Sequence, residues 1–178
     1  MMKTKSGFGK RGALATLSLL LGCSFACGLY YAVPKTAHAE KDAGSGAFDY
    51  TLSGEDNADI WNLAMAQAET DAVSIQLVAD WQADGETGFG AGDGFDGGAL
   101  LVKGSVTLDL NGYSLDRNLS AESETGWVIR VAENSKLVIR DSSAAKTGTL
   151  TGAYGINGGA IYAYSSSSAR PIEIELDG

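Results

Sequence analysis

Cysteine and histidine are nearly absent from this chain of 178 residues, which has two cysteines and one histidine. All three, Cys23, Cys27 and His38, precede residue 40. Residues 40–178 therefore cannot form a disulfide, a cysteine nucleophile, a Ser-His-Asp triad or a Cys/His zinc site among themselves. This excludes several common catalytic and metal-binding classes.

Positive charge is also scarce, with 13 Lys and Arg against 22 Asp and Glu and a net charge of −9. Every acidic residue follows residue 39, whereas five basic residues precede it. A nucleic-acid partner requires a basic surface, so we expect none.

The N-terminal residues have the layout of a secretory signal peptide. Lys3, Lys5, Lys10 and Arg11 precede an uncharged apolar run, 12–33, and the small-residue pattern Ala37-His38-Ala39 follows it. This order predicts a signal peptide over 1–39 and a secreted or cell-surface protein. Two alternatives stay open. The run is long enough to be an uncleaved membrane anchor, and Leu20-Leu21-Gly22-Cys23 resembles a lipoprotein signal.

After a polar leader, 40–47, the next segment predicts a strand, a helix and a strand. Apolar residues alternate over 48–52 and 73–77, which is typical of half-buried strands. A helix is predicted over 57–69, with Asp56 as N-cap. Its apolar face is predicted to contain Ile60, Leu63, Ala64 and Ala68.

A loop rich in glycine and aspartate, 80–98, completes this segment, 48–98. Carboxylates on such a loop suit Ca²⁺, which makes Asp93 and Asp96 candidate ligands. The stretch resembles only one copy of a repeat that needs several, so we expect a solvated loop and keep the calcium site as the alternative. The aspartates would repel phosphate and no helix is predicted to follow, which argues against a nucleotide site.

The three tryptophans have different predicted roles. Trp61 lies on the predicted helix and Trp127 opens a strand, so we expect both in the core. Trp81 lies at a loop edge beside Asp80 and is the candidate exposed ring for contact with a ligand.

Residues 99–178 consist of short strands in a repeating unit. Each unit has a short apolar strand, a polar turn, a second alternating strand and then Asn or Asp; the three copies are 100–102 with 106–111, 129–131 with 137–141, and 161–163 with 172–177. Aligning Val106, Leu137 and Ile172 gives spacings of 31 and 35 residues. Such uneven spacing predicts a mostly β fold, a right-handed parallel β-helix of about three coils preceded by the strand–helix–strand cap.

Two motifs carry a resemblance to known families. The segment 106–115, Val-Thr-Leu-Asp-Leu-Asn-Gly-Tyr-Ser-Leu, resembles the first coil of bacterial right-handed β-helix surface proteins of the pectin-lyase-like superfamily. Gly158-Gly159-Ala160-Ile161 resembles the repeat of polymorphic surface adhesins, and 97–100 is a weaker copy; the Phe-x-x-Asn partner of that repeat is absent. The resemblance implies a surface β-helix, and it supplies no catalytic residue.

Two functions follow as expectations. The first is a secreted or surface adhesin, or a structural or binding module, that contacts extracellular glycans or surface proteins. The alternative is a polysaccharide lyase or glycosidase on the same coils, with Asp109 and Asp141 as candidate acid and base and with Lys103 and Arg117 as the bases nearest the acidic loop. Alternation places Asp109 toward solvent, and Asp141 suits a turn.

The chain stops directly after a predicted strand, with no closing helix or polar coil. We therefore expect it to be the N-terminal part of a longer protein, with any C-terminal membrane anchor missing.

Overall fold

The computed structural model describes residues 48–177, which form a mostly β structure. Its elements in chain order are β1 (Tyr50–Leu52), α1 (Asn57–Ala68), β2 (Val73–Leu77), β3 (Trp81–Gln82), β4 (Phe95–Asp96), β5 (Ala99–Val102), β6 (Ser105–Asp109), β7 (Ser114–Asp116), β8 (Ile129–Val131), β9 (Lys136–Arg140), β10 (Thr149–Thr151), β11 (Ile161–Ala163) and β12 (Glu173–Asp177).

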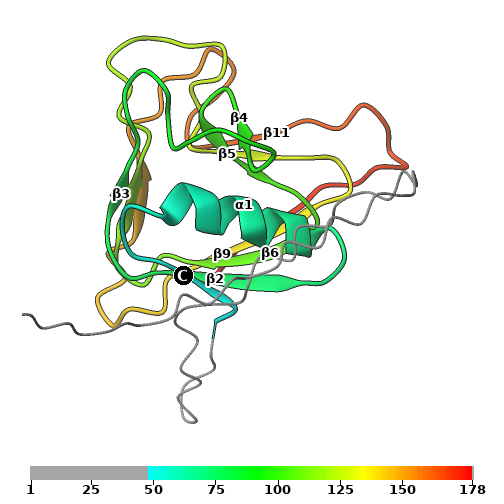
Figure 1. Cartoon of the computed structure of the whole chain (residues 1–178). Coiled ribbons are helices and arrows are strands. Elements are labelled where there is room, and N and C mark those ends of the chain that lie inside the picture. Colours follow the sequence, from blue (N-terminus) through cyan, green and yellow to red (C-terminus); the bar gives the residue numbers. More distant parts are fainter. Residues whose placement is uncertain (1–47, 178) are drawn as a thin grey trace, which may run out of the picture. The chain divides into compact units, whose positions relative to one another are not determined.

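The strands belong to three sheets with the orders β1-β2-β6-β9-β12, β10-β7-β3 and β11-β8-β5-β4. Of the pairs between these named strands, only β4 with β5 is antiparallel. From β5 onward, consecutive strands go to different sheets, so that β5, β6 and β7 occupy one position each and β8, β9 and β10 repeat the pattern one strand further along. In the view of Figure 1 the sheets lie on three sides of helix α1.

The strand registers test the predicted repeat. Leu100 pairs with Ile129, and Ile129 with Ile161, as the repeat predicts. Val106 pairs with Leu137, which confirms the spacing of 31. Leu137 then pairs with Ile174, so the predicted alignment with Ile172 is wrong by two residues. A two-residue shift keeps every side chain on its face, and the hydrophobic pattern cannot detect it.

The buried face of helix α1 overlaps the predicted one, since Ala64 and Ala68 are buried and Ile60 packs against the core, but it does not include Leu63. Trp61 and Met65 are fully buried with Ala64, whereas Leu63 is 46% exposed. The Trp61 indole N–H donates to the Gly94 carbonyl at 2.9 Å, which turns this side of the helix inward. The prediction that Trp61 and Trp127 lie in the core is confirmed.

The predicted N-cap position, Asp56, is confirmed, but its side chain makes no capping hydrogen bond. The side-chain oxygen of Asn57, the first helical residue, accepts from the Gly54 amide at 3.0 Å and so bonds the start of the helix to the preceding turn. The helix ends at Ala68, one residue before the predicted end.

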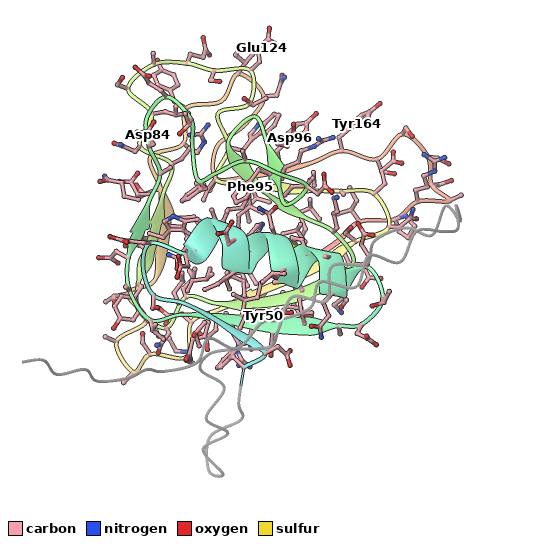
Figure 2. All side chains as sticks on the ribbon, in the orientation of Figure 1. Tyr50, Asp84, Phe95, Asp96, Glu124 and Tyr164 are labelled. Atoms are coloured by element: carbon pink, nitrogen blue, oxygen red, sulfur yellow. The ribbon has the colours of Figure 1, made fainter. Side chains whose placement is uncertain are left out.

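The prediction of a solvated loop over 80–98 is wrong, because this segment contains the short strands β3 and β4 and its residues 91–95 pack against α1. The Asn62 side chain donates to the Ala91 carbonyl and accepts from the Gly94 amide. A Cβ at Gly94 would lie 2.8 Å from the Trp61 ring, and one at Gly92 would lie 2.8 Å from the Asn62 amide. These glycines therefore allow a close approach to the helix. Phe95, also buried, lies beside α1 in Figure 2.

The predicted signal peptide and leader lie outside the described residues. Within 48–177, no helix has the length and apolar character needed to cross a membrane.

Candidate functional site

The outer face of sheet β3–β7–β10 is the best candidate for a binding site, and we call it the lateral face. It consists of the side chains of Asp80, Gln82, Ser114, Asp116, Thr149 and Thr151. Gln82 pairs in register with Asp116, and Asp116 with Thr151, so one ladder crosses all three strands. Ser114 and Thr149 form a second pair in the same direction.

Alternation in two short strands produces this face. In β7, Leu115 is fully buried between Ser114 and Asp116, and in β10, Leu150 packs against the core between two exposed threonines. Successive side chains of a strand point to opposite sides, so an inward leucine places its polar neighbours outward.

Hydrogen bonds hold the lateral face in one arrangement. The Gln82 amide donates to Asp116 Oδ2 at 3.0 Å, and the Ser114 backbone amide donates to Asp80 Oδ1 at 2.8 Å. The Thr149 hydroxyl donates to the Ser114 hydroxyl at 2.9 Å. Because these contacts come from adjacent strands, little side-chain freedom remains to be lost when a ligand binds.

The face is hollowed where Asp80, Trp81, Gln82, Ser114, Asp116 and Thr151 meet, with a volume of about 330 Å³. Carboxylate, amide and hydroxyl groups both accept and donate hydrogen bonds, which matches the hydroxyls of a sugar. The two carboxylates oppose an anionic ligand. The hollow therefore suits a neutral polyhydroxylated molecule.

Trp81 does not present the exposed ring expected of it. Its side chain is 9% exposed and meets Phe89 edge to face, with ring centroids 5.0 Å apart. The reason is its position in β3, where it pairs with the buried Leu115. It supports the floor of the hollow, and its ring face is not free for stacking.

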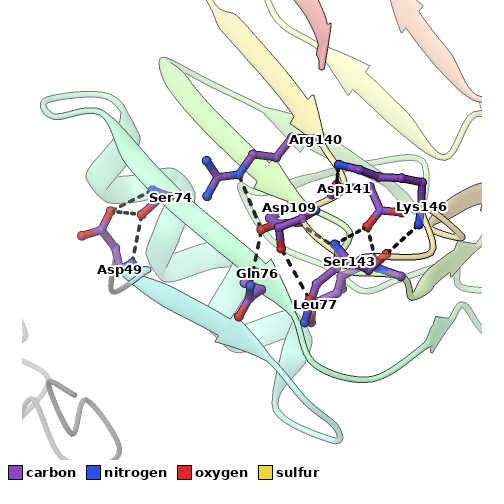
Figure 3. Close-up of polar contacts among 12 residues, drawn as sticks. Asp49, Ser74, Gln76, Leu77, Asp109, Arg140, Asp141, Ser143 and Lys146 are labelled. Atoms are coloured by element: carbon purple, nitrogen blue, oxygen red, sulfur yellow. Dashed lines mark hydrogen bonds and ion pairs between the residues drawn. The ribbon is translucent and has the colours of Figure 1, made fainter. Parts of the chain in front are cut away.

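Asp109 is fully buried, which corrects the expectation that it points to solvent. The amides of Asn111 and Ser142 each donate to its Oδ1 at 2.9 Å, and Gln76 and Arg140 flank its Oδ2 (Figure 3). Burial raises the pKa of Asp109, but hydrogen bonds led by those from Ser142 outweigh it and hold the pKa below its ordinary value. Alternation predicted that Asp109 lies on the outward side of β6. It could not predict that Gln76, Arg140 and Ser142 cover the carboxylate there.

Asp141 is a turn residue, as predicted. It is 8% exposed and accepts hydrogen bonds from the backbone amides of Gly112, Ser143 and Gly148. Burial raises the pKa of Asp141, but the bonds from Ser143, Gly148 and Gly112 outweigh it and lower the pKa to about 2.

The catalytic pairing of Asp109 and Asp141 stays a prediction. In the structure both carboxylates stabilise backbone turns. Each bonds backbone amides of its own turn and of the neighbouring repeat. With both pKa values lowered, neither group holds a proton for donation near neutral pH.

The two candidate calcium ligands, Asp93 and Asp96, have different surroundings. The Asp96 carboxylate forms an ion pair with Arg130, whereas Asp93 is exposed. Among residues 48–177, no group of three or more His, Cys, Asp or Glu side chains is arranged to hold a metal ion. The calcium site stays a prediction.

A repeated Asp-x-Asn signal was missed by the sequence reasoning. In both Asp109-Leu110-Asn111 and Asp116-Arg117-Asn118, the Asp Oδ1 accepts from the Asn amide two residues later. Each Asn has a positive φ and donates its side-chain amide to a backbone carbonyl 34 or 35 residues earlier, that of Leu77 or Ala83. This motif at each corner could have located the turn after β7, and with it the lateral face.

Comparison with family models, with curated proteins and with solved structures finds no match for this chain.

Proposed function

We propose that residues 48–177 are the first coils of a right-handed parallel β-helix, of the pectin-lyase-like kind, that acts outside the cell as an adhesin or binding module. Two observations support the coils. Successive strands from β5 onward join the three sheets in a recurring order, and β2, β6, β9 and β12 pair in parallel register. Support for the extracellular location comes from the layout of residues 1–39.

The ligand we propose is a neutral glycan on the lateral face. The observation that carries this is the hollow, in which groups from three adjacent strands meet in a fixed hydrogen-bonding arrangement. A shallow, polar site without an exposed aromatic ring favours weak binding, with Kd on the order of 0.1–1 mM for one site. Repeated presentation on a surface would compensate for the weak single contact.

A lyase or glycosidase on the same coils is the less supported alternative. Arg117, one of the two bases considered for it, is 3% exposed and donates to the Gly97 carbonyl at 2.9 Å. It therefore secures the loop over 80–98 and does not face solvent.

The test is calorimetry of the full chain with xylan, neutral mucin glycans, pectin and hyaluronan, with and without Ca²⁺. We expect binding of a neutral glycan that Gln82→Ala and Asp116→Ala each weaken at least fivefold. Thr107→Ala, on the outer face of another sheet, is the control and leaves binding unchanged. Binding that survives both variants, or release of unsaturated sugars from any substrate, would overturn the proposal.

A further inference from the structure

The chain contains two Asn-Gly pairs, Asn111-Gly112 and Asn157-Gly158. The backbone nitrogen of the glycine in such a pair can attack the side-chain carbonyl carbon of the asparagine. The new N–C bond closes a five-membered succinimide ring, the bond from that carbon to the side-chain nitrogen breaks, and ammonia leaves. Water then opens the ring at either carbonyl and produces aspartate or isoaspartate. Glycine has no Cβ to obstruct the attack, so the fold around each pair decides its reactivity.

The first pair forms a tight turn after β6. Asn111 and Gly112 have φ angles of 48° and 83°. The Tyr113 amide donates to the Leu110 carbonyl at 2.8 Å and closes the turn. Positive φ at both central residues is typical of a type I′ turn, for which Asn-Gly is a preferred sequence. The turn therefore fixes the conformation of this pair.

Both nitrogen atoms of the reaction are hydrogen-bonded in this turn. The attacking nitrogen, the amide of Gly112, donates to Asp141 Oδ1 at 2.8 Å. The leaving nitrogen, in the Asn111 side chain, donates to the Leu77 carbonyl at 3.1 Å. Leu77 ends β2 and Asp141 directly follows β9, and these two strands flank β6 in the sheet. Asp141 is charged and only 8% exposed, so its bond to the Gly112 amide is strong. Ring closure therefore requires the corner to open.

The second pair lies in an exposed loop. Asn157 and Gly158 are both exposed, and a Cβ built on Gly158 would meet no other atom within 4 Å. A Cβ on Gly112, by contrast, would lie 3.1 Å from the Ser143 side chain. Exposed loop segments open at little cost in free energy, so the second pair can reach the geometry of ring closure without unfolding of the sheets.

We propose that Asn157 is a site of spontaneous deamidation in the folded protein, whereas Asn111 reacts only when its corner opens. The carboxylate formed at position 157 adds one negative charge to an exposed loop. A carboxylate formed at position 111 would face the Leu77 carbonyl, acceptor against acceptor, so an altered chain loses that bond. These residues are separate from the lateral face, and the reaction does not depend on glycan binding.

The test follows both pairs in the full chain, incubated in mildly alkaline buffer with and without urea and then mapped by peptide mass spectrometry. In the folded chain we expect Asn157 to be converted at least tenfold faster than Asn111. In urea the two rates should become equal, because both pairs then have the same local chemistry. Asn118 is the control, since it is exposed but followed by Leu119, and it should react slowly in both conditions. Equal rates at Asn111 and Asn157 in the folded chain, or conversion of Asn157 in urea alone, would overturn the proposal.

A variant then identifies the group that protects Asn111. Asp141→Ala removes the acceptor of the Gly112 amide and should raise the rate at Asn111 at least fivefold, with the rate at Asn157 unchanged. Asp93→Ala, the same change at an exposed aspartate, is the matched control and should alter neither rate. Asp141→Ser keeps a hydrogen-bond acceptor and should raise the rate at Asn111 at least twofold if the Ala variant does not fold. An unchanged rate at Asn111 in a folded Asp141 variant would overturn the proposal.

Discussion

Buried carboxylates act as backbone acceptors at the corners between sheets. Asp109 and Asp141 each accept bonds from backbone amides that belong to two different repeats. An amide inside a corner loses its water, so a charged acceptor there satisfies a group that would otherwise cost free energy.

Acid should therefore destabilise the fold through these residues. The folded-state pKa of Asp141, about 2, lies below its ordinary value of 3.8, so the unfolded chain binds a proton first as the pH falls. The stabilisation is complete above about pH 5 and is lost between about pH 4 and 2. We expect Asp141→Asn to make the fall of the urea midpoint over this range shallower. Asp93→Asn, an exposed change, is the control, and an equal slope in Asp141→Asn and the unchanged chain would contradict the assignment.

The glycines of the loop over 80–98 can be tested in the same way. Gly94→Ala places a Cβ 2.8 Å from the Trp61 ring and 3.0 Å from Asn62 Oδ1. We expect a loss of about 1–3 kcal/mol in the free energy of unfolding, measured by urea titration. Gly159→Ala meets no atom within 4 Å and should change stability by less than about 0.5 kcal/mol. Similar losses in both variants would refute the packing role of this loop.

At the scale of elements, stability depends on whether a strand has a neighbour on both sides. Leu137 in β9 is fully buried between β6 and β12, whereas Leu176 in β12 is 71% exposed. A leucine thus occurs both in an interior strand and in the outermost described strand of one sheet.

Leu137→Ala should cost about 2–5 kcal/mol, because it removes a buried side chain and leaves a cavity. Leu176→Ala should cost less than about 0.5 kcal/mol, since most of that side chain is already in water. Chemical denaturation of the two variants checks this. A large loss in Leu176→Ala would mean that another part of the protein covers β12.

Sequence pattern predicted most strands and missed what depends on contacts between elements. Alternation located β2, β6, β9 and β12 because inward and outward residues differ in polarity. It could not predict the pairing of Leu137 with Ile174, because a shift of two preserves the pattern. It placed Leu63 on the buried helix face, whereas the contact of Trp61 with Gly94 turns Trp61 inward and leaves Leu63 exposed. It missed β3, β4 and β7, whose two or three residues are too few to show a period.

At the scale of the whole molecule, the lateral face depends on the stacking of chain segments in parallel register. It needs β3, β7 and β10 side by side, and the same order of segments places β12 beside β9. The proposed function therefore depends on the register of successive repeats.

Cysteine crosslinking between β9 and β12 measures that register most directly. Side chains directly opposite each other on neighbouring strands lie on strands about 4.8 Å apart, which a short thiol reagent can span. In a chain with Cys23→Ser and Cys27→Ser, we expect the pair Val138→Cys with Glu175→Cys to crosslink rapidly, since these positions are opposite each other. The pair Val138→Cys with Glu173→Cys should react much more slowly, and urea should abolish the difference. Faster crosslinking to position 173, or equal rates in the folded protein, would contradict the account.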